Sequence, residues 1–106
     1  MHTQIITFNL NGMSEAEFTE ACREKYAPAF ATIRGLVSKV WLRNSDTNTY
    51  GGVYTWQDRL AMEEYRKSEL FKALLANPQF ANLQSMDFAV MEEPTRMTRG
   101  LVEVPA

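Results

Sequence analysis

The sequence predicts an α+β fold of the ferredoxin-like type, with the element order β-α-β-β-α-β and two helices on one face of a four-stranded antiparallel sheet. Three observations lead to this prediction. Runs rich in β-branched and aromatic residues alternate with stretches of helical periodicity. The two middle runs, residues 36–43 and 50–56, are separated by the polar segment NSDTNT, which indicates an antiparallel hairpin. The length of 106 residues indicates one domain, residues 1–106.

The first strand is predicted over residues 4–10 (QIITFNL), where β-branched and aromatic side chains dominate. The first helix begins at Ser14, because Ser14 and Glu17 have the spacing of a capping box. Its apolar positions recur at helical spacing and are Phe18, Cys22, Tyr26, Ala29, Phe30 and Ile33. Pro28 lies within this pattern and lacks a backbone N–H, so we expect the helix to kink or restart over residues 25–27.

The second helix begins at Asp58, which is a good N-terminal cap. Its inner stripe is predicted to contain Ala61, Tyr65, Ser68, Phe71 and Leu75. Asn77-Pro78 ends this helix. We expect one short helical turn over residues 79–83 and the fourth strand over residues 85–92. Pro94 then closes the strand, and residues 95–106 are expected to form a C-terminal tail.

Both faces of the sheet are predicted to be buried. In the strand 36–43, Val37 and Trp41 oppose Leu36, Val40 and Leu42, and both sets are apolar. Two helices cover only one face, so the other face needs a second cover. We expect a second copy of the chain to supply it, which gives a homodimer of the dimeric α/β barrel type.

Composition excludes several classes of partner. The net charge is −2 and lysine and arginine form no block, so we expect no binding to nucleic acid. No apolar run is long enough to span a membrane, and the N-terminal segment lacks the features of a signal peptide. Cys22 is the only cysteine and allows no internal disulfide. These features fit a cytoplasmic protein.

Three segments carry a family resemblance: GLVSKVW (35–41), YGGVYTW (50–56) and MEEPTRMTRG (91–100). They resemble the YdhR-like monooxygenases of the dimeric α/β barrel superfamily, which also includes antibiotic-biosynthesis monooxygenases. The resemblance extends from the first strand to about Gly100 and implies a small homodimer with a pocket between sheet and helices. In better-understood relatives such pockets oxidise aromatic polyketides without a cofactor, or degrade haem with an asparagine, a tryptophan and a haem-ligating histidine. Asn9 and a tryptophan match the first two, whereas His2 is the only histidine, so we expect no haem and no other cofactor.

Lys39 is the first candidate catalytic residue, because it lies between apolar neighbours on a predicted strand. Burial would lower its pKa and make it a base or an anchor for an anion. The alternative is a lysine that snorkels at the sheet edge or pairs with Asp87 or Asp46. Gly51-Gly52 in the partner strand indicates a bulge or a close approach by another group.

The large aromatic residues of the hairpin, Trp41, Tyr54 and Trp56, are candidates for holding a flat substrate, with the Tyr54 hydroxyl as a catalytic hydrogen-bond donor. Tyr26 and Tyr65, on the inner stripes of the two helices, are further candidates for the same pocket. For all five residues the alternative is ordinary packing in the core or the dimer interface.

Asn9, near the end of the first strand, is the third candidate catalytic residue, because its amide can hold a substrate carbonyl or an oxygen species. The alternative is a cap at the strand end. Asp87 is either a general base or a solvent-facing or lysine-paired carboxylate. His2 is expected to be disordered and without a role, and Cys22 to be a small core residue. No cluster of side chains has metal-ligand spacing, so no metal site is predicted.

Three functional hypotheses follow. The first is a cofactor-independent monooxygenase that acts on a small, hydrophobic aromatic substrate and uses Lys39, Tyr54, Trp41 and Asn9. The second is a non-catalytic dimer of the same fold that binds a small aromatic or acidic ligand. The third is a structural dimer whose core is filled by side chains.

Overall fold

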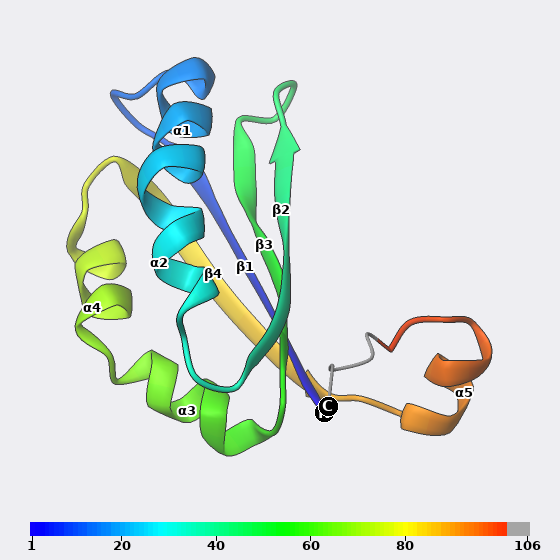
Figure 1. The fold of residues 1–106 in the computed structure, drawn as a ribbon. Coiled ribbons are helices and arrows are strands. Elements are labelled where there is room, and N and C mark those ends of the chain that lie inside the picture. The colour runs from blue at the N-terminus through cyan, green and yellow to red at the C-terminus, as the bar shows by residue number, and fades with distance from the viewer. Residues whose placement is uncertain (102–106) are drawn as a thin grey trace.

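The computed structural model describes residues 1–101 and has the predicted α+β architecture (Figure 1). One antiparallel sheet has the strand order β2-β3-β1-β4. Its strands are β1 (His2–Leu10), β2 (Leu36–Asn44), β3 (Thr49–Trp56) and β4 (Phe80–Ala89). One face of the sheet is covered by α1 (Glu15–Ala21), the π-helical segment η1 (Cys22–Tyr26), α2 (Ala27–Ala31), α3 (Arg59–Arg66) and α4 (Glu69–Ala76). The predicted fold class is therefore confirmed.

The first helical unit begins and bends where the sequence predicts. The Glu17 backbone N–H donates to the Ser14 hydroxyl, and the Ser14 N–H donates to the Glu17 carboxylate, each over 3.1 Å. The helix widens into the π-helical turn η1 and restarts as α2. Pro28 lies in the first turn of α2, directly after the wide turn of η1, and has no N–H to donate to the preceding helical turn. The restart over residues 25–27 is confirmed.

The second helical unit is broken at Ser68, and the prediction of one continuous helix with Ser68 and Leu75 on its inner stripe is wrong. The Ser68 hydroxyl donates to the Tyr65 carbonyl over 2.6 Å and accepts from the Phe71 N–H over 3.2 Å. A serine side chain that bonds the backbone in this way ends one helix and caps the next. Leu75 on α4 is 53% exposed as a result.

Strand β4 begins at Phe80, five residues earlier than predicted, and the expected helical turn over residues 79–83 is absent. Phe80 and Ala81 pair with Leu10 and Asn9 of β1, so tertiary pairing prevails over the local turn signal. The tail prediction is also wrong in part, because α5 (Glu92–Met97) follows β4 and includes Pro94 in its first turn. Residues 102–106 of the predicted tail lie outside the described residues.

The core lies between the sheet and the helices. It consists of two adjoining clusters, one of Ile6, Phe30, Tyr54, Trp56, Met62, Tyr65 and Phe71 and the other of Leu10, Phe18, Tyr50 and Phe80. A register shift between Leu36 and Ser38 turns Leu36 toward this core, so Leu36 does not share a face with Val40 as predicted. No helix of the described chain is both long enough and apolar enough to cross a membrane.

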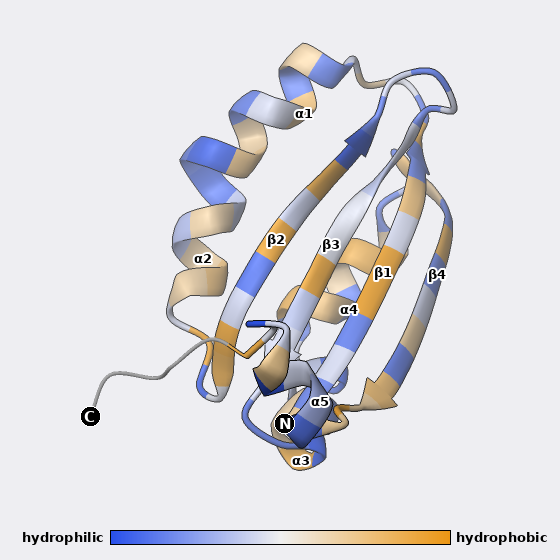
Figure 2. Cartoon of the chain, turned by 90° about the vertical axis from the view of Figure 1, so that its right-hand side faces the viewer, coloured by the Kyte–Doolittle hydropathy of each residue, from blue (hydrophilic) through white to orange (hydrophobic). Residues whose placement is uncertain are grey.

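The other face of the sheet carries no helix (Figures 1 and 2). Figure 2 looks onto this face and shows apolar bands crossing the strands, with α5 projecting in front of one end. Val40, Met86 and Phe88 are each more than half exposed there. The two faces of the sheet thus differ: one holds the core and the other presents apolar side chains to the surroundings.

Candidate functional site

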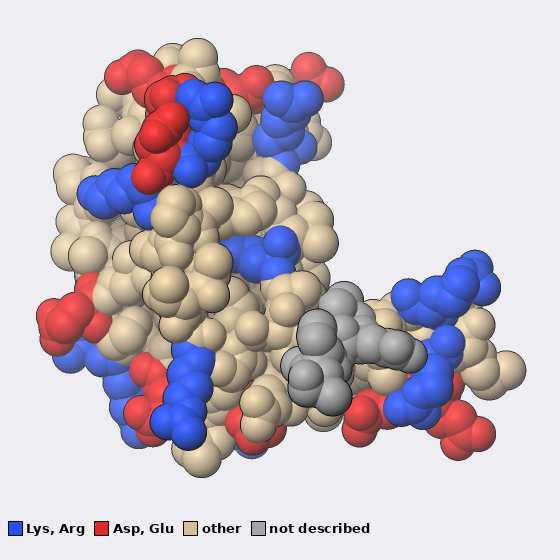
Figure 3. Space-filling model, viewed as in Figure 1, with Lys and Arg blue, Asp and Glu red and all other residues tan. Residues whose placement is uncertain are grey.

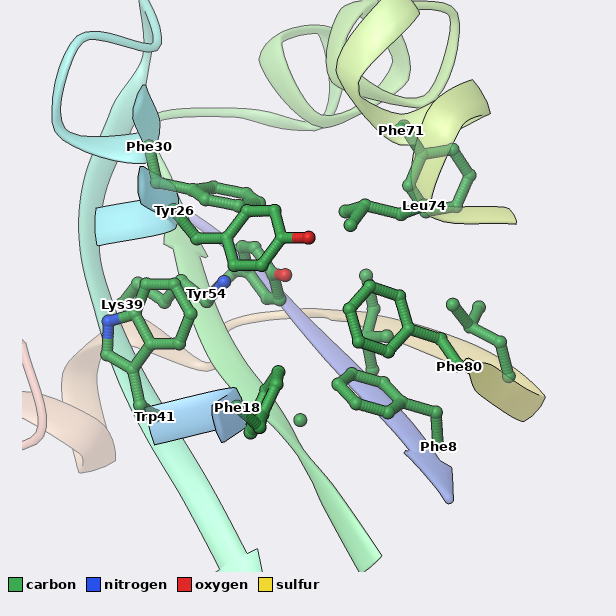
Figure 4. A pocket seen from close by; sticks show the side chains of 13 residues that line it. Phe8, Phe18, Tyr26, Phe30, Lys39, Trp41, Tyr54, Phe71, Leu74 and Phe80 are labelled. Atoms are coloured by element: carbon green, nitrogen blue, oxygen red, sulfur yellow. The ribbon is translucent and has the colours of Figure 1, made fainter. Parts of the chain in front are cut away.

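A cavity of about 30 Å³ lies between the helices and the sheet, and thirteen residues from both layers line it (Figure 4). This volume holds about two water molecules. Most of the lining is aromatic or aliphatic, and the polar groups of its side chains are the Lys39 amine, the Trp41 indole N–H and the hydroxyls of Tyr26 and Tyr54. Figure 4 shows both hydroxyls pointing into the space between the surrounding rings. The cavity is the one place in the described chain where an amine and two phenols meet inside an apolar wall.

Lys39 reaches the cavity because strand alternation places it on the helix-covered face, opposite Tyr54 of β3. Its Nζ lies 3.5 Å from the ring centroid of Phe30, 3.5 Å from that of Trp41 and 4.4 Å from that of Tyr54. No carboxylate of residues 1–101 forms a salt bridge with it, and Asp87 pairs with His2 instead. Three aromatic rings therefore take the place of an ionic partner around Lys39.

Burial lowers the pKa of Lys39 to about 7, and a negative charge on Cys22 would raise it. The three rings oppose the decrease, because an ammonium over a ring face is attracted by the π electrons. Both forms of the Lys39 amine are thus accessible near neutral pH. A buried amine of this kind can accept a proton from a ligand or remain charged beside an anion.

The glycine pair of β3 makes room for this arrangement. A Cβ atom on Gly52 would lie 2.7 Å from Cε of Lys39, and one on Gly51 would lie 1.8 Å from the Ile6 carbonyl oxygen of β1. Gly51 thus allows a close approach of two strands and Gly52 allows the Lys39 stem to cross β3. The close approach predicted from Gly51-Gly52 is confirmed.

The tyrosines and tryptophans differ in their access to the cavity. Tyr26, Trp41 and Tyr54 line it, as the sequence predicts, whereas Trp56 and Tyr65 do not. Trp56 is fully buried, stacks on Tyr54 at 6.0 Å between ring centroids, and donates from Nε1 to Oε1 of Gln4 over 3.0 Å. Trp56 is therefore a core residue behind the cavity wall.

Tyr54 and Tyr65 are adjacent phenols in the core, with ring centroids 5.8 Å apart. Burial raises the pKa of both hydroxyls above the usual range, and the neighbouring Tyr65 raises that of Tyr54 further. The Tyr65 hydroxyl is buried and has no hydrogen-bond partner among the described residues. Both tyrosines therefore keep their protons at neutral pH, and Tyr54 offers its proton to the cavity.

Asn9 does not line the cavity. Its Nδ2 donates to the Asn48 carbonyl over 2.8 Å, and its Oδ1 accepts from Nδ2 of Asn82 over 2.9 Å. Both ends of the side-chain amide are thus occupied in tying β1 to the hairpin turn and to β4. This geometry corresponds to the strand-end role that the sequence offered as the alternative.

His2 is an ordered strand residue, so the prediction that it is disordered is wrong. It is buried in β1, and its Nε2 lies 2.7 Å from Oδ1 of Asp87. Asp87 is therefore neither solvent-facing nor paired with a lysine. The signal was present in the sequence: His2, Gln4 and Ile6 alternate with Thr3 and Ile5, so the first strand begins two residues earlier than predicted.

The His2–Asp87 pair does not line the cavity. A neighbouring hydrogen bond of 3.0 Å from Gln4 Nε2 to Ser85 Oγ completes a polar cluster on the same face of the sheet. Since His2 is the only histidine, no imidazole is placed to ligate a haem in the cavity. Among residues 1–101, no three histidine, cysteine or acidic side chains gather in a way that could hold a metal ion.

Two surface hollows flank the cavity on the side of β2. One of about 310 Å³ is lined by α2 and the beginning of β2, including Phe30, Val37 and Lys39. The other, of about 200 Å³, includes Phe18 and Cys22. Trp41 lines both hollows and the cavity. Its indole, together with Phe30 and Lys39, therefore lies between the cavity and the larger hollow.

Few charged side chains lie in the middle of this face, and Lys39 is among the residues that line the larger hollow. Figure 3 shows most lysine, arginine and acidic side chains near the two ends of the molecule and on the projecting arm, and one basic patch among uncharged atoms in the middle of this face. A ligand that approaches between α2 and β2 thus meets both polar and apolar surface, and the rings of Phe30 and Trp41 belong to the apolar part.

A sequence model of the family described as "Putative mono-oxygenase ydhR" matches residues 4–101. The chain belongs to the ydhR family. This assignment confirms the resemblance of its hairpin and its C-terminal segment, and it supports a monooxygenase-like role. No curated protein matches the chain.

Solved structures similar to this ydhR-family chain include oxygenases. SnoaB, a cofactor-independent oxygenase from Streptomyces nogalater, in a mutant form, is 25% identical, with a TM-score of 0.67 over 86% of this chain and 93% of SnoaB. MhuD from Mycobacterium tuberculosis, a haem degrader with two haems in its active site, is 18% identical, with a TM-score of 0.69 over 88% of this chain and 98% of MhuD. NE2512 from Nitrosomonas europaea, of unknown function, is 13% identical, with a TM-score of 0.72 over 99% of this chain and 94% of that one. The last two likenesses concern the fold alone.

Proposed function

We propose that this ydhR-family protein is a cofactor-independent monooxygenase that acts on a small, flat, electron-rich aromatic substrate. The observation that carries the proposal is the Lys39 amine, which is surrounded by three aromatic rings and shares its cavity with the Tyr26 and Tyr54 hydroxyls. The similarity to SnoaB, a cofactor-independent oxygenase, supports the reaction class. The aromatic lining supports the class of substrate.

In this proposal the side chains of the cavity have different roles in binding the substrate and in removing its proton. Phe30 and Trp41 stack on the flat substrate, and the neutral Lys39 amine removes a proton from its phenolic hydroxyl or activated C–H group. The resulting Lys39 ammonium stays beside the substrate anion and stabilises it in a poorly hydrated site. Tyr54 keeps its own proton and donates a hydrogen bond to the substrate oxygen.

The electron-rich substrate anion then reacts directly with dioxygen. For an anthrone, the ring methylene carbon forms a bond to one oxygen atom, and the hydroperoxide loses water to leave a carbonyl group. One oxygen atom is retained in the quinone and the other leaves as water, so the overall change is CH₂ + O₂ → C=O + H₂O. The enclosure by aromatic side chains keeps solvent away from the anion.

Substrate binding in this proposal requires Trp41 to move. The cavity of about 30 Å³ holds about two water molecules, and the indole, together with Phe30 and Lys39, lies between it and the neighbouring hollow of about 310 Å³. Rotation of Trp41 would join the two spaces beside Lys39. The substrate thus enters between α2 and the edge strand β2.

Oxygen consumption with a panel of anthrones and quinols tests the proposal. The wild type is expected to consume oxygen above the rate in buffer with at least one of these compounds. Lys39→Ala is expected to lose most of this activity, and Tyr54→Phe is expected to lose part of it. Lys72→Ala is the matched control, because Lys72 is exposed on α4 and is expected to leave the rate unchanged. No turnover above buffer with any compound would contradict the proposal.

The small cavity volume favours one alternative, a dimer of the same fold that binds a small aromatic ligand without turnover. In that case the same compounds would raise the melting temperature of the protein while oxygen consumption stays at the level of buffer. Loss of the stabilisation in Lys39→Ala would assign the binding to this site.

A homodimer that forms through the helix-free face of the sheet is part of the proposal. Its support is the exposed apolar set of Val40, Met86 and Phe88, because an exposed apolar sheet face is a typical interface. Size measurement in solution is expected to give about twice the 12.1 kDa of one chain. The single cysteine and the lack of any disulfide support a reducing, cytoplasmic location.

A further inference from the structure

We propose that Lys39 is a nucleophilic amine that captures small aromatic aldehydes and ketones as an imine. This activity is separate from oxygen chemistry and needs no oxidant. Its geometric basis is the position of Lys39 between the enclosed cavity and the surface hollow of about 310 Å³, both of which its side chain lines. The ligand class is a flat apolar molecule with one carbonyl group.

The surroundings of the amine satisfy the first requirement of such a site, which is a lone pair free to attack. Lysines are usually protonated near neutral pH, and exposed ones pair readily with acids, as Lys72 does with Glu69 at 3.6 Å. Lys39 has no such partner in the described chain, and burial lowers the pKa of its amine to about 7, while the surrounding rings oppose this decrease. Far more of the Lys39 amine than of an exposed lysine is therefore uncharged at neutral pH.

The walls satisfy the second requirement, which is recognition of the carbonyl compound. The rings of Phe30 and Trp41 lie 3.5 Å from Nζ, measured to their centroids, and both residues also line the surface hollow. An aromatic aldehyde in this hollow can contact Phe30 or Trp41 while its carbonyl carbon faces the amine. A polar aliphatic aldehyde gains no such contact, so the site should prefer aromatic carbonyl compounds.

The reaction balances without a co-reactant. The Lys39 nitrogen forms a bond to the carbonyl carbon, and a proton passes from nitrogen to the carbonyl oxygen to give a carbinolamine. The oxygen leaves as water, and a C=N double bond forms. Protonation of the imine would place a cation among the same three rings, where its charge is stabilised.

Reductive trapping tests the proposal on the wild-type protein. The protein is incubated at about pH 7 with benzaldehyde and cyanoborohydride, and the labelled residues are identified by peptide mass spectrometry. The three exposed lysines, Lys25, Lys67 and Lys72, serve as controls within the same molecule. Because a pKa of about 7 instead of about 10.4 changes the neutral fraction by more than a thousandfold, labelling of Lys39 should exceed that of each control by roughly a hundredfold or more.

Two comparisons separate recognition of the aromatic aldehyde from the effect of a low pKa of the Lys39 amine alone. Glyceraldehyde at the same concentration should label Lys39 more slowly than benzaldehyde, whereas the exposed lysines should show no such preference. Lys39→Arg keeps the positive charge without a nucleophilic amine and should lose only the label at position 39. Equal labelling of all four lysines, or labelling of the exposed ones alone, would overturn the proposal.

Discussion

Lys39 and Tyr54 face each other across the paired strands β2 and β3, with Nζ of Lys39 4.4 Å from the centroid of the Tyr54 ring. Burial is the largest cause of both pKa shifts, which are downward for the Lys39 amine and upward for the Tyr54 hydroxyl. The site therefore disfavours charge on either group. At neutral pH the Lys39 amine can therefore accept a proton while the Tyr54 hydroxyl retains its own, as the proposed reaction requires.

The lowered pKa of Lys39 predicts a specific dependence of stability on pH. Its pKa is about 7 in the folded protein and about 10.4 in an unfolded chain. Between these values the unfolded state binds more protons at this residue, so the free energy of unfolding should rise with pH. We expect a gain on the order of 1–3 kcal/mol from about pH 7 to about pH 9.5, after allowance for the opposing rings. Urea unfolding of the wild type and of Lys39→Met at both pH values measures it.

The control for this measurement concerns the other titratable groups around Lys39, which are Cys22 and Tyr26 of η1 and Tyr54 of β3. Burial raises the pKa of each of them, so near and above their usual pKa ranges they lower stability as pH rises. Subtracting the free energy of unfolding of Lys39→Met from that of the wild type at each pH removes their contribution. Cys22→Ala, made in the wild type and in Lys39→Met, shows whether the thiol contributes to the remaining difference. An equal rise in wild type and Lys39→Met would show that Lys39 is not the cause.

Replacing Trp41 by alanine should open the site. The indole lines the cavity and both surface hollows, so its removal would join them and admit wider aromatic ligands. We expect faster ligand association and a loss of about 2–3 kcal/mol in stability, since Trp41 also packs edge-on against Phe30 at 5.7 Å. Stopped-flow fluorescence with a series of quinones of increasing width measures the first effect.

Trp41→Phe is the intermediate variant, because it keeps an aromatic wall while reducing its size. Its association rates should fall between those of the wild type and Trp41→Ala. If all three proteins bind the widest ligand at the same rate, the ligand route does not pass this side chain.

Local signals predicted the parts of the fold that depend on neighbouring residues. Ser14 with Glu17 identified the start of α1, and Pro28 identified its restart, because capping and proline geometry act within one helical turn. Ser68 was misassigned because the same hydroxyl fits a helix interior and a cap, and only packing selects between them. Phe80 was misassigned because its strand pairing with Leu10 joins residues far apart in the chain.

The candidate site was predictable to a similar degree. Strand alternation predicted that Lys39 and Trp41 share one face of their strand, since a period of two determines which side chains share a face. The pairing that places Tyr54 opposite Lys39 depends on the register between β2 and β3, which alternation alone does not determine. Alternation could not show that both groups of the Asn9 amide are hydrogen-bonded, one to the Asn48 carbonyl and the other to the Asn82 side chain. Nor could it show that three rings surround Lys39, because Phe30 comes from a helix whose position relative to β2 depends on the whole core.

The helix-free face of the sheet predicts a substitution that separates the subunits. Phe88 on β4 is 51% exposed, and a charge there would be buried without a partner in a dimer. Phe88→Glu is therefore expected to lower the apparent mass from about twice the chain mass to about one chain mass. Sedimentation at micromolar concentration measures it.

Leu75→Glu is the matched control for Phe88→Glu. Leu75 has nearly the same exposure, 53%, but lies on α4, on the opposite side of the sheet. It should leave the mass unchanged. A wild-type protein that sediments as a monomer, or an equal effect of the two substitutions, would contradict an interface on the sheet.

The His2–Asp87 pair should contribute to stability and not to the chemistry of the cavity. Asp87→Ala would leave the buried imidazole of His2 without its partner at 2.7 Å, which costs about 1–3 kcal/mol. Neither residue lines the cavity, so the rate of oxygen consumption per folded molecule should stay unchanged. Asp46→Ala, in the exposed hairpin turn, provides the control and should change neither quantity. A large loss of activity in fully folded Asp87→Ala would instead place this pair in the reaction. A free energy of unfolding equal to that of the wild type would show that the pair contributes nothing to the stability of the fold.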